Sequence, residues 1–145
     1  MRFMNRKFLF GTLLTLISCG ILPNRAIEVV DDFYEYQQDG SANFPEYMFA
    51  DMEVALQARF ALSQREMIYG AYISHNRIET SRRISIEENK TREIVTYIFM
   101  VTGENGETQE TLMLERHGTS EPFQITAYVI EGISSFYEPA PKSIT

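Results

Sequence analysis

Residues 93–101, Glu-Ile-Val-Thr-Tyr-Ile-Phe-Met-Val, decide the fold of this chain. The stretch is rich in β-branched and aromatic residues, which favour strands. It is apolar at nearly every position, and such a run is typical of a strand inside a sheet with both faces covered. We therefore expect a central strand here, with both of its faces buried.

Further strands are expected on either side of this one, separated by turn signals. Gly103-Glu104-Asn105-Gly106 contains the Asn-Gly pair that is typical of a β-hairpin, and it leads into Thr108–Arg116. The alternating segment Phe123–Glu131 follows as the last strand. Upstream, Ala71–Ile86 predicts a bulged strand or two shorter pieces, and Glu87–Lys90 is a polar turn. The sequence thus predicts about four antiparallel strands.

Helical patterns precede the strands. Asn24 is a suitable N-cap for Arg25–Gln38, which has an apolar side and an acidic side. From Glu46 to Tyr69 there is neither Gly nor Pro, so we expect one long helix, or a short helix followed by a longer one, ending at Gly70. The stripe that we expect to be buried consists of Phe49, Met52, Leu56 and Phe60, widened by Met48, Ala55 and Leu62.

These elements predict an α+β domain, with two or three N-terminal helices packed on one face of a curved antiparallel sheet of about four strands. The order of segments from Asn24 to Glu131, including Gln64-Arg65-Glu66 and the closing 123–130 strand, resembles small exported domains with an NTF2-like (cystatin-like) cone fold. Such domains often have a tryptophan in the last strand, where Phe123 stands here. Proteins of this fold range from hydrolases to pure binding proteins, so the resemblance implies a fold and not an activity.

The start of the chain resembles the export signal of a bacterial lipoprotein. Basic residues at positions 2, 6 and 7 precede the apolar run Phe8–Ile17, which is too short for the roughly 20 residues that span a bilayer core. Leu16-Ile17-Ser18-Cys19 resembles the lipobox. The resemblance implies cleavage before Cys19, the only cysteine, and a thioether-linked diacylglycerol with palmitate-type chains on its sulfur.

This signal predicts four regions: a signal peptide (1–18), a lipidated cysteine with a short tether (19–23), the domain (24–132) and a loosely ordered tail (133–145). Cleavage removes three of the 13 basic and none of the 20 acidic residues, which leaves 127 residues with a formal net charge of −10. This charge argues against nucleic acid as a partner and leaves the lipid as the contact with the membrane. Since Gly20 and not aspartate follows Cys19, the resemblance implies the outer membrane, facing the periplasm, where the source has two membranes.

Few residues indicate chemistry. We find no phosphate-binding loop and no metal-ligand spacing, and we expect no cofactor. His75 and His117 stand beside predicted turns, where we expect solvated side chains. Acidic and basic groups along the strands are candidates for an acid–base set at the open end of a cone, although the same alternation suits an outer face with cross-strand ion pairs. This set is Glu93, Glu110 and Glu115, with Arg92, Arg116 or Tyr97.

Two functions remain open. The first, which we favour, is a lipid-anchored, non-catalytic binding or assembly module of the bacterial cell envelope. Its uncovered sheet face would dock a second copy of the chain or an envelope protein. The alternative is an enzyme or small-ligand carrier that uses the cavity of the cone.

Overall fold

The computed structural model describes residues 25–38 and 44–133. The predicted N-cap Asn24, the lipobox with Cys19, the tether and the tail beyond residue 133 lie outside the described residues. The elements, in order, are α2 (Ala26–Gln38), the 3-10 turn η1 (Glu46–Met48), α3 (Met52–Tyr69), β1 (Tyr72–Glu87), β2 (Lys90–Gly103), β3 (Gly106–His117) and β4 (Gln124–Ile130).

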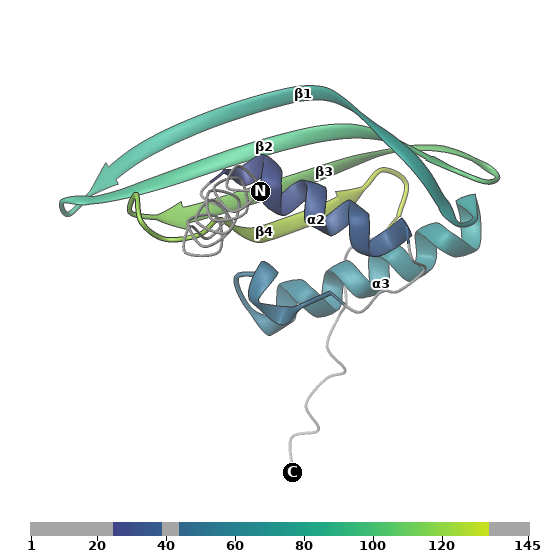
Figure 1. Ribbon diagram of the computed structural model, residues 1–145, viewed down its shortest axis with the longest axis horizontal. Coiled ribbons are helices and arrows are strands. Elements are labelled where there is room, and N and C mark those ends of the chain that lie inside the picture. Colours follow the sequence, from purple (N-terminus) through teal and green to yellow (C-terminus); the bar gives the residue numbers. More distant parts are fainter. Residues whose placement is uncertain (1–24, 39–43, 134–145) are drawn as a thin grey trace, which may run out of the picture.

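The four strands form one antiparallel sheet in the order β1-β2-β3-β4, so each strand pairs with its neighbour in the chain. Figure 1 shows the long, curved sheet with α2 and α3 packed against it. The prediction of an α+β domain with N-terminal helices on a four-stranded antiparallel sheet is confirmed.

The first helix has the predicted two-sided character. Its acidic residues, Glu28, Asp31, Asp32 and Glu35, are exposed to solvent. The opposite side is buried against the sheet and the other helical segments, and it contains Ala26, Val29, Val30, Phe33, Tyr34 and Gln37. The acidic residues therefore form a solvated helix face.

The helical stretch after residue 45 is split in two, which confirms the second of the two predicted arrangements. η1 ends at Met48, and α3 begins after Asp51, whose side chain accepts a hydrogen bond from the Val54 amide at 2.9 Å. This bond satisfies one of the free N–H groups at the start of the helix. α3 ends at Gly70, whose φ of 77° is the left-handed conformation that favours glycine.

The strand β1 is a single strand with two irregularities, in agreement with the bulged form that the sequence predicted. Its pairing with β2 shifts register between Tyr72 and Ser74 and again between Arg77 and Glu79. Each shift leaves one residue of β1 unpaired, so residues three apart across the bulge face the same side of the sheet.

The prediction that β2 lies inside the sheet is confirmed, but only one of its faces is fully covered. Val95, Tyr97, Phe99 and Val101 point toward the helices and are almost completely buried. Ile98 and Met100 point to the other side and are only half-buried. Both helices lie on the same face, because side chains of α2 and of α3 contact the same inward-facing residue, Glu110 of β3. We call this the inner face and the opposite one the outer face.

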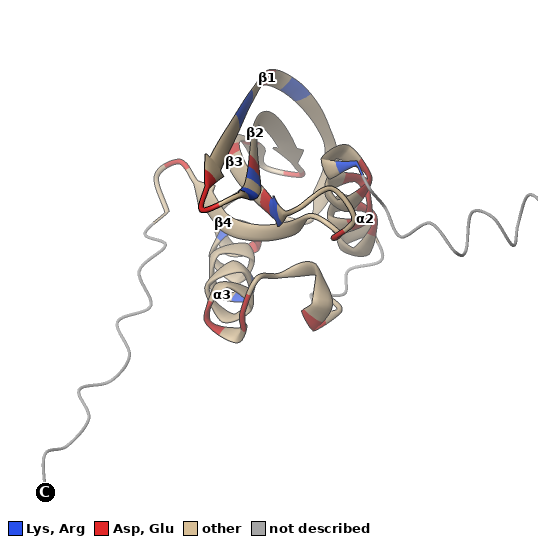
Figure 2. Cartoon of the chain, turned by 90° about the vertical axis from the view of Figure 1, so that its left-hand side faces the viewer, with Lys and Arg blue, Asp and Glu red and all other residues tan. Residues whose placement is uncertain are grey.

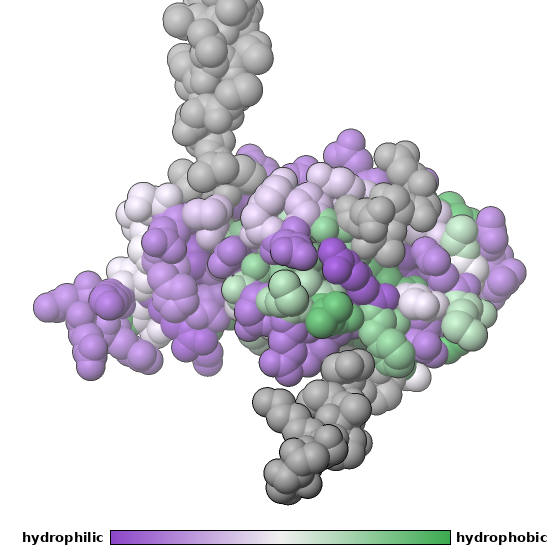
Figure 3. Space-filling model, turned by 90° about the horizontal axis from the view of Figure 1, so that it is seen from below, coloured by the Kyte–Doolittle hydropathy of each residue, from purple (hydrophilic) through white to green (hydrophobic). Residues whose placement is uncertain are grey.

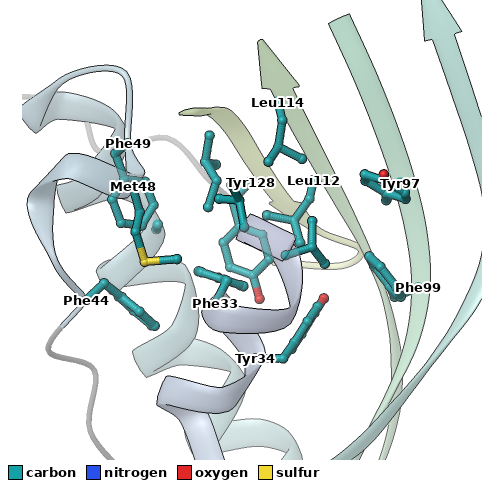
Figure 4. Close-up of a cluster of buried hydrophobic side chains, with 14 of the residues drawn as sticks. Phe33, Tyr34, Phe44, Met48, Phe49, Tyr97, Phe99, Leu112, Leu114 and Tyr128 are labelled. Atoms are coloured by element: carbon teal, nitrogen blue, oxygen red, sulfur yellow. The ribbon is translucent and has the colours of Figure 1, made fainter. Parts of the chain in front are cut away.

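The core between the helices and the inner face is rich in aromatic rings (Figure 4). Phe33 lies at its centre, with ring centroids 5.0 Å from Phe44, 5.0 Å from Tyr128 and 6.4 Å from Phe49. Edge-on and stacked contacts of this kind stabilise a core beyond the area that they bury.

The prediction of the buried stripe between residues 48 and 62 is wrong in part. Phe49, Met48, Ala55 and Leu62 are buried, but Met52, Leu56 and Phe60 are exposed. The buried side of the helix carries Ala55, Ala58, Ala61, Leu62 and Arg65. We attribute the difference to volume: rings from α2, from the segment before α3 and from the sheet already occupy much of the core, so α3 packs through the side that carries its three alanines at 55, 58 and 61.

Candidate functional site

The most unusual feature of the interior is a buried ion pair. Arg65 of α3 places its Nη1 atom 2.8 Å from Oε2 of Glu110 on β3, and the two side chains are only 2% and 0% exposed. Buried charges in proteins are almost always paired in this way, because an isolated charge cannot be solvated there.

Three further side chains complete a buried network around this pair. Oε1 of Glu110 accepts hydrogen bonds from the hydroxyls of Tyr34, at 3.2 Å, and Tyr128. Arg65 donates to the Tyr128 hydroxyl at 3.3 Å and to Oε1 of Gln37 at 2.5 Å. We refer to these five residues as the internal network. It connects α2, α3, β3 and β4.

The electrostatics of the internal network keep both phenols neutral. Burial, together with the charge of Glu110, raises the pKa of Tyr34 and of Tyr128 well above the ordinary tyrosine value. For Arg65, burial acts to lower the pKa, but Tyr128 and Glu110 reverse this effect and raise it. The Glu110 carboxylate thus accepts three hydrogen bonds, all from members of the internal network.

The predicted acid–base residues do not converge on one site. Glu110 lies in the internal network, whereas Glu93 at the other end of the inner face pairs with Arg82 and, at 2.7 Å, with Arg116. Glu115 pairs with Arg92. Of the two interpretations that the strand alternation allowed, cross-strand ion pairing describes Glu93 and Glu115. Tyr97 is a buried member of the core.

The two histidines differ. His117 is exposed at the end of β3, as expected for a residue beside a turn. The expectation was wrong for His75, which lies within β1 and stacks on Tyr34 at a centroid distance of 4.1 Å. Its Nδ1 atom is 2.5 Å from the Tyr72 hydroxyl. Burial lowers the pKa of His75 below its ordinary value, and Asp31 opposes this only in part.

The described part of the chain was searched for groups of metal-ligating side chains and for helices able to cross a membrane. No group of three or more His, Cys, Asp or Glu side chains is suitably placed there to hold a metal ion. None of the helices formed by these residues is both long enough and apolar enough to cross a bilayer.

The second unusual feature lies on the surface. Met52, Leu56, Phe60 and Met67 are 63%, 47%, 41% and 77% exposed, and they follow one side of α3, directly opposite its alanine side. We call this row the outer α3 face. Figure 3, a view from below Figure 1, shows apolar side chains gathered on this underside of the molecule. Contiguous apolar surface of this kind commonly marks an interaction site.

The sequence analysis missed Arg65, Tyr34, Tyr128 and Gln37 as members of a polar site. One signal was available, since Arg65 continues the 58, 61, 62 spacing of the small-residue side of α3. A charged residue in a buried stripe needs a partner of opposite charge. The identity of that partner depends on which strand lies opposite, and this was not evident from local patterns.

In comparisons with known proteins, no protein-family model, no curated protein and no solved structure matches this chain.

Proposed function

We propose that this chain is a lipid-anchored, non-catalytic binding module of a bacterial cell envelope, and that its outer α3 face pairs with the same face of a second copy. The observation that carries the proposal is the outer α3 face, which presents four large apolar side chains to solvent. Desolvating such side chains is favourable by about 25 cal/mol for each Å² removed from water.

The spacing of the outer α3 face suits a helix partner. Leu56, Phe60 and Met67, with the small exposed Ser63 between the last two, follow the alternating four- and three-residue steps of a helix-pairing seam. A two-fold axis that runs parallel to the two paired helices brings the same residues of both copies together. Attachment of both copies to one membrane would raise their effective concentration and favour even a weak pairing.

The outer face of the sheet supports docking less well than the outer α3 face. Its exposed large apolar side chains are Ile73, Ile78, Met113 and Val129, at 57%, 54%, 36% and 45%, and they are scattered over three strands. Those of the outer α3 face follow one side of a single helix and reach 77% at Met67. The outer face of the sheet is also interrupted by the ion pair of Arg92 with Glu115. The proposal therefore moves the docking surface from the sheet, where the sequence analysis expected it, to the helix.

A non-catalytic role is supported by the state of the acidic groups. The internal network holds Glu110 among donors at 0% exposure, and guanidinium groups hold Glu93 and Glu115. A general acid or base needs access to a substrate within hydrogen-bonding distance. None of the three carboxylates combines such access with freedom from an ion pair.

Self-pairing can be tested in cells with a single engineered thiol. When Cys19 is lipidated, a Ser63→Cys variant has one free thiol, on the outer α3 face. We expect a disulfide-linked dimer in the envelope fraction, and we expect the added substitution Leu56→Glu to abolish it. The matched control is Glu28→Cys, on the exposed acidic face of α2. Equal dimer from both thiols, or none from Ser63→Cys, would contradict the pairing.

The anchor is tested separately with Cys19→Ser. We expect this full-length variant to remain uncleaved and to incorporate no labelled palmitate, whereas the unchanged chain incorporates it. Normal labelling of Cys19→Ser would refute the lipid anchor without affecting the pairing test.

A further inference from the structure

A hollow of about 220 Å³ lies between the start of α2 and the middle of β1. Arginine side chains border it from both elements, although the protein as a whole is acidic. In Figure 2, basic residues form two separate bands on the β1 arch. The hollow is lined by Arg25, Ala26 and Ile27 at the start of α2, by Arg77, Thr80 and Arg82 on β1, and by Val95 and Tyr97 on β2.

The bulge in β1 creates this arrangement. Arg77 and Arg82 are five residues apart, and strict alternation would place them on opposite faces of the sheet. Because the register shifts between Arg77 and Glu79, Arg77 pairs with Phe99 and Arg82 with Val95. Both partners are inward-facing core residues, so both arginines lie on the inner side. Bulges often re-aim a side chain toward a functional site.

The charge around the hollow is not balanced by its neighbours. Within residues 25–38 and 44–133, Arg25 and Arg77 form no salt bridge. Arg82 pairs with Glu93, but Arg116 holds the other oxygen of that carboxylate. Glu93 is thus shared between two cations. The hollow retains a surplus of positive charge, even with Asp31 of α2 nearby.

The charges around the hollow affect the pKa of Tyr97, which lines the hollow from β2. Burial raises the pKa of its hydroxyl, whereas Arg77, Arg82 and Arg25, in decreasing order, act to lower it, and Asp31 acts weakly in the opposite direction. The three guanidinium groups are therefore close enough to act together on one point of the hollow.

We propose that this hollow binds a phosphate group. Guanidinium groups match the oxygens of phosphate with paired hydrogen bonds, and Thr80 supplies a hydroxyl beside them. The volume is below the roughly 300–1,000 Å³ of pockets that enclose whole drug-sized ligands. The hollow therefore takes the phosphate itself and leaves the remainder of the ligand outside.

Two sources can supply such a group: a free phosphate compound or the headgroup of a membrane lipid. Five residues lie between Cys19 and Arg25, so the six steps from one to the other reach at most about 20 Å. A lipidated Cys19 would keep the hollow within that distance of the headgroups. The lipid source rests on the anchor proposed above, whereas binding of free phosphate does not.

The first arm of the test uses the full chain in a neutral detergent. Inorganic phosphate and glycerol 3-phosphate are titrated at constant ionic strength while chemical shifts or heats are recorded. We expect saturable binding that weakens at least tenfold in Arg77→Gln, because a hydrogen bond between charged groups is lost. The matched control is Arg83→Gln, which removes the same charge from the outer face, where Arg83 pairs with Ile94.

The second arm compares the lipidated chain in vesicles of phosphatidylcholine with vesicles of equal parts phosphatidylcholine and phosphatidylglycerol. A lipid source predicts a higher unfolding temperature in the second kind, and loss of that increase in Arg77→Gln but not in Arg83→Gln. A response in the detergent arm alone identifies a free phosphate compound. Absence of a response in both arms, or equal loss in both variants, would overturn the phosphate site.

Discussion

Replacement of Arg65 by methionine tests whether the internal network holds the helices on the sheet. The substitution preserves much of the side-chain volume but removes the charge and the bonds to Glu110, Tyr128 and Gln37. Glu110, at 0% exposure, would retain only the two phenols as donors. Breaking a buried pair by removing one partner typically costs about 3–5 kcal/mol, because the remaining charge stays buried.

This loss is large compared with the stability of a small domain, about 5–15 kcal/mol. Urea unfolding followed by far-ultraviolet circular dichroism measures it directly. With a slope near 2 kcal/mol per M, the midpoint of the Arg65→Met chain is expected to fall by about 2 M.

Two further variants make the outcome decisive. Arg92→Met breaks the pair with Glu115, in which the arginine is 42% exposed, and is expected to cost no more than about 1 kcal/mol. Adding Glu110→Leu to Arg65→Met is expected to recover part of the loss, since no charge then remains buried. If Arg65→Met costs no more than Arg92→Met, or if the double variant is less stable than the single one, the reasoning is refuted.

Two other predictions concern His75 and the close contact between α3 and β2. Burial lowers the pKa of His75 in the folded state, so the stability that it contributes is present above about pH 6.5 and is lost as pH falls toward the lower folded-state value. Thermal unfolding between about pH 7 and 5 should therefore show a smaller decrease in unfolding temperature for His75→Phe than for the unchanged chain, and an equal decrease in both would show that burial of His75 is irrelevant to stability. A Cβ atom on Gly103 would lie 2.4 Å from the Tyr69 carbonyl oxygen, so Gly103→Ala should cost about 1–3 kcal/mol in urea unfolding. The neighbouring Thr102→Ala serves as control, and an equal loss in both variants would show that the close contact is not the cause.

Most of the fold was predictable because each element has a clear local pattern. The apolar run at 93–101, the Gly103–Gly106 turn and the two-sided Arg25–Gln38 pattern each indicated an element that the structure contains. The split between η1 and α3 was left open, since the cap that decides it, Asp51, depends on where the chain turns. Local patterns are informative here because the meander joins neighbouring strands only.

The predicted site residues did not come together, because their distances depend on how whole elements pack. Glu110 was predicted only as a candidate member of an acid–base set, and its partners in the structure come from α2, α3 and β4, up to 76 positions away in the chain. Glu93 and Glu115 were picked out with it, yet they form ion pairs of their own at other places on the sheet.

The sequence by itself thus determined the order of the elements, the number of strands and the acidic surface of α2, all of which follow from short-range residue patterns. Tertiary structure decided which side of α3 is buried, since aromatic rings from other elements occupy much of the core and favour the side of α3 that carries three alanines. It also placed Arg77 and Arg82 in one hollow, because the bulge after Arg77 turns both side chains to the same face of the sheet. Strict alternation along the strand would have placed them on opposite faces. Both outcomes depend on volume and register, which arise only when distant segments are packed together.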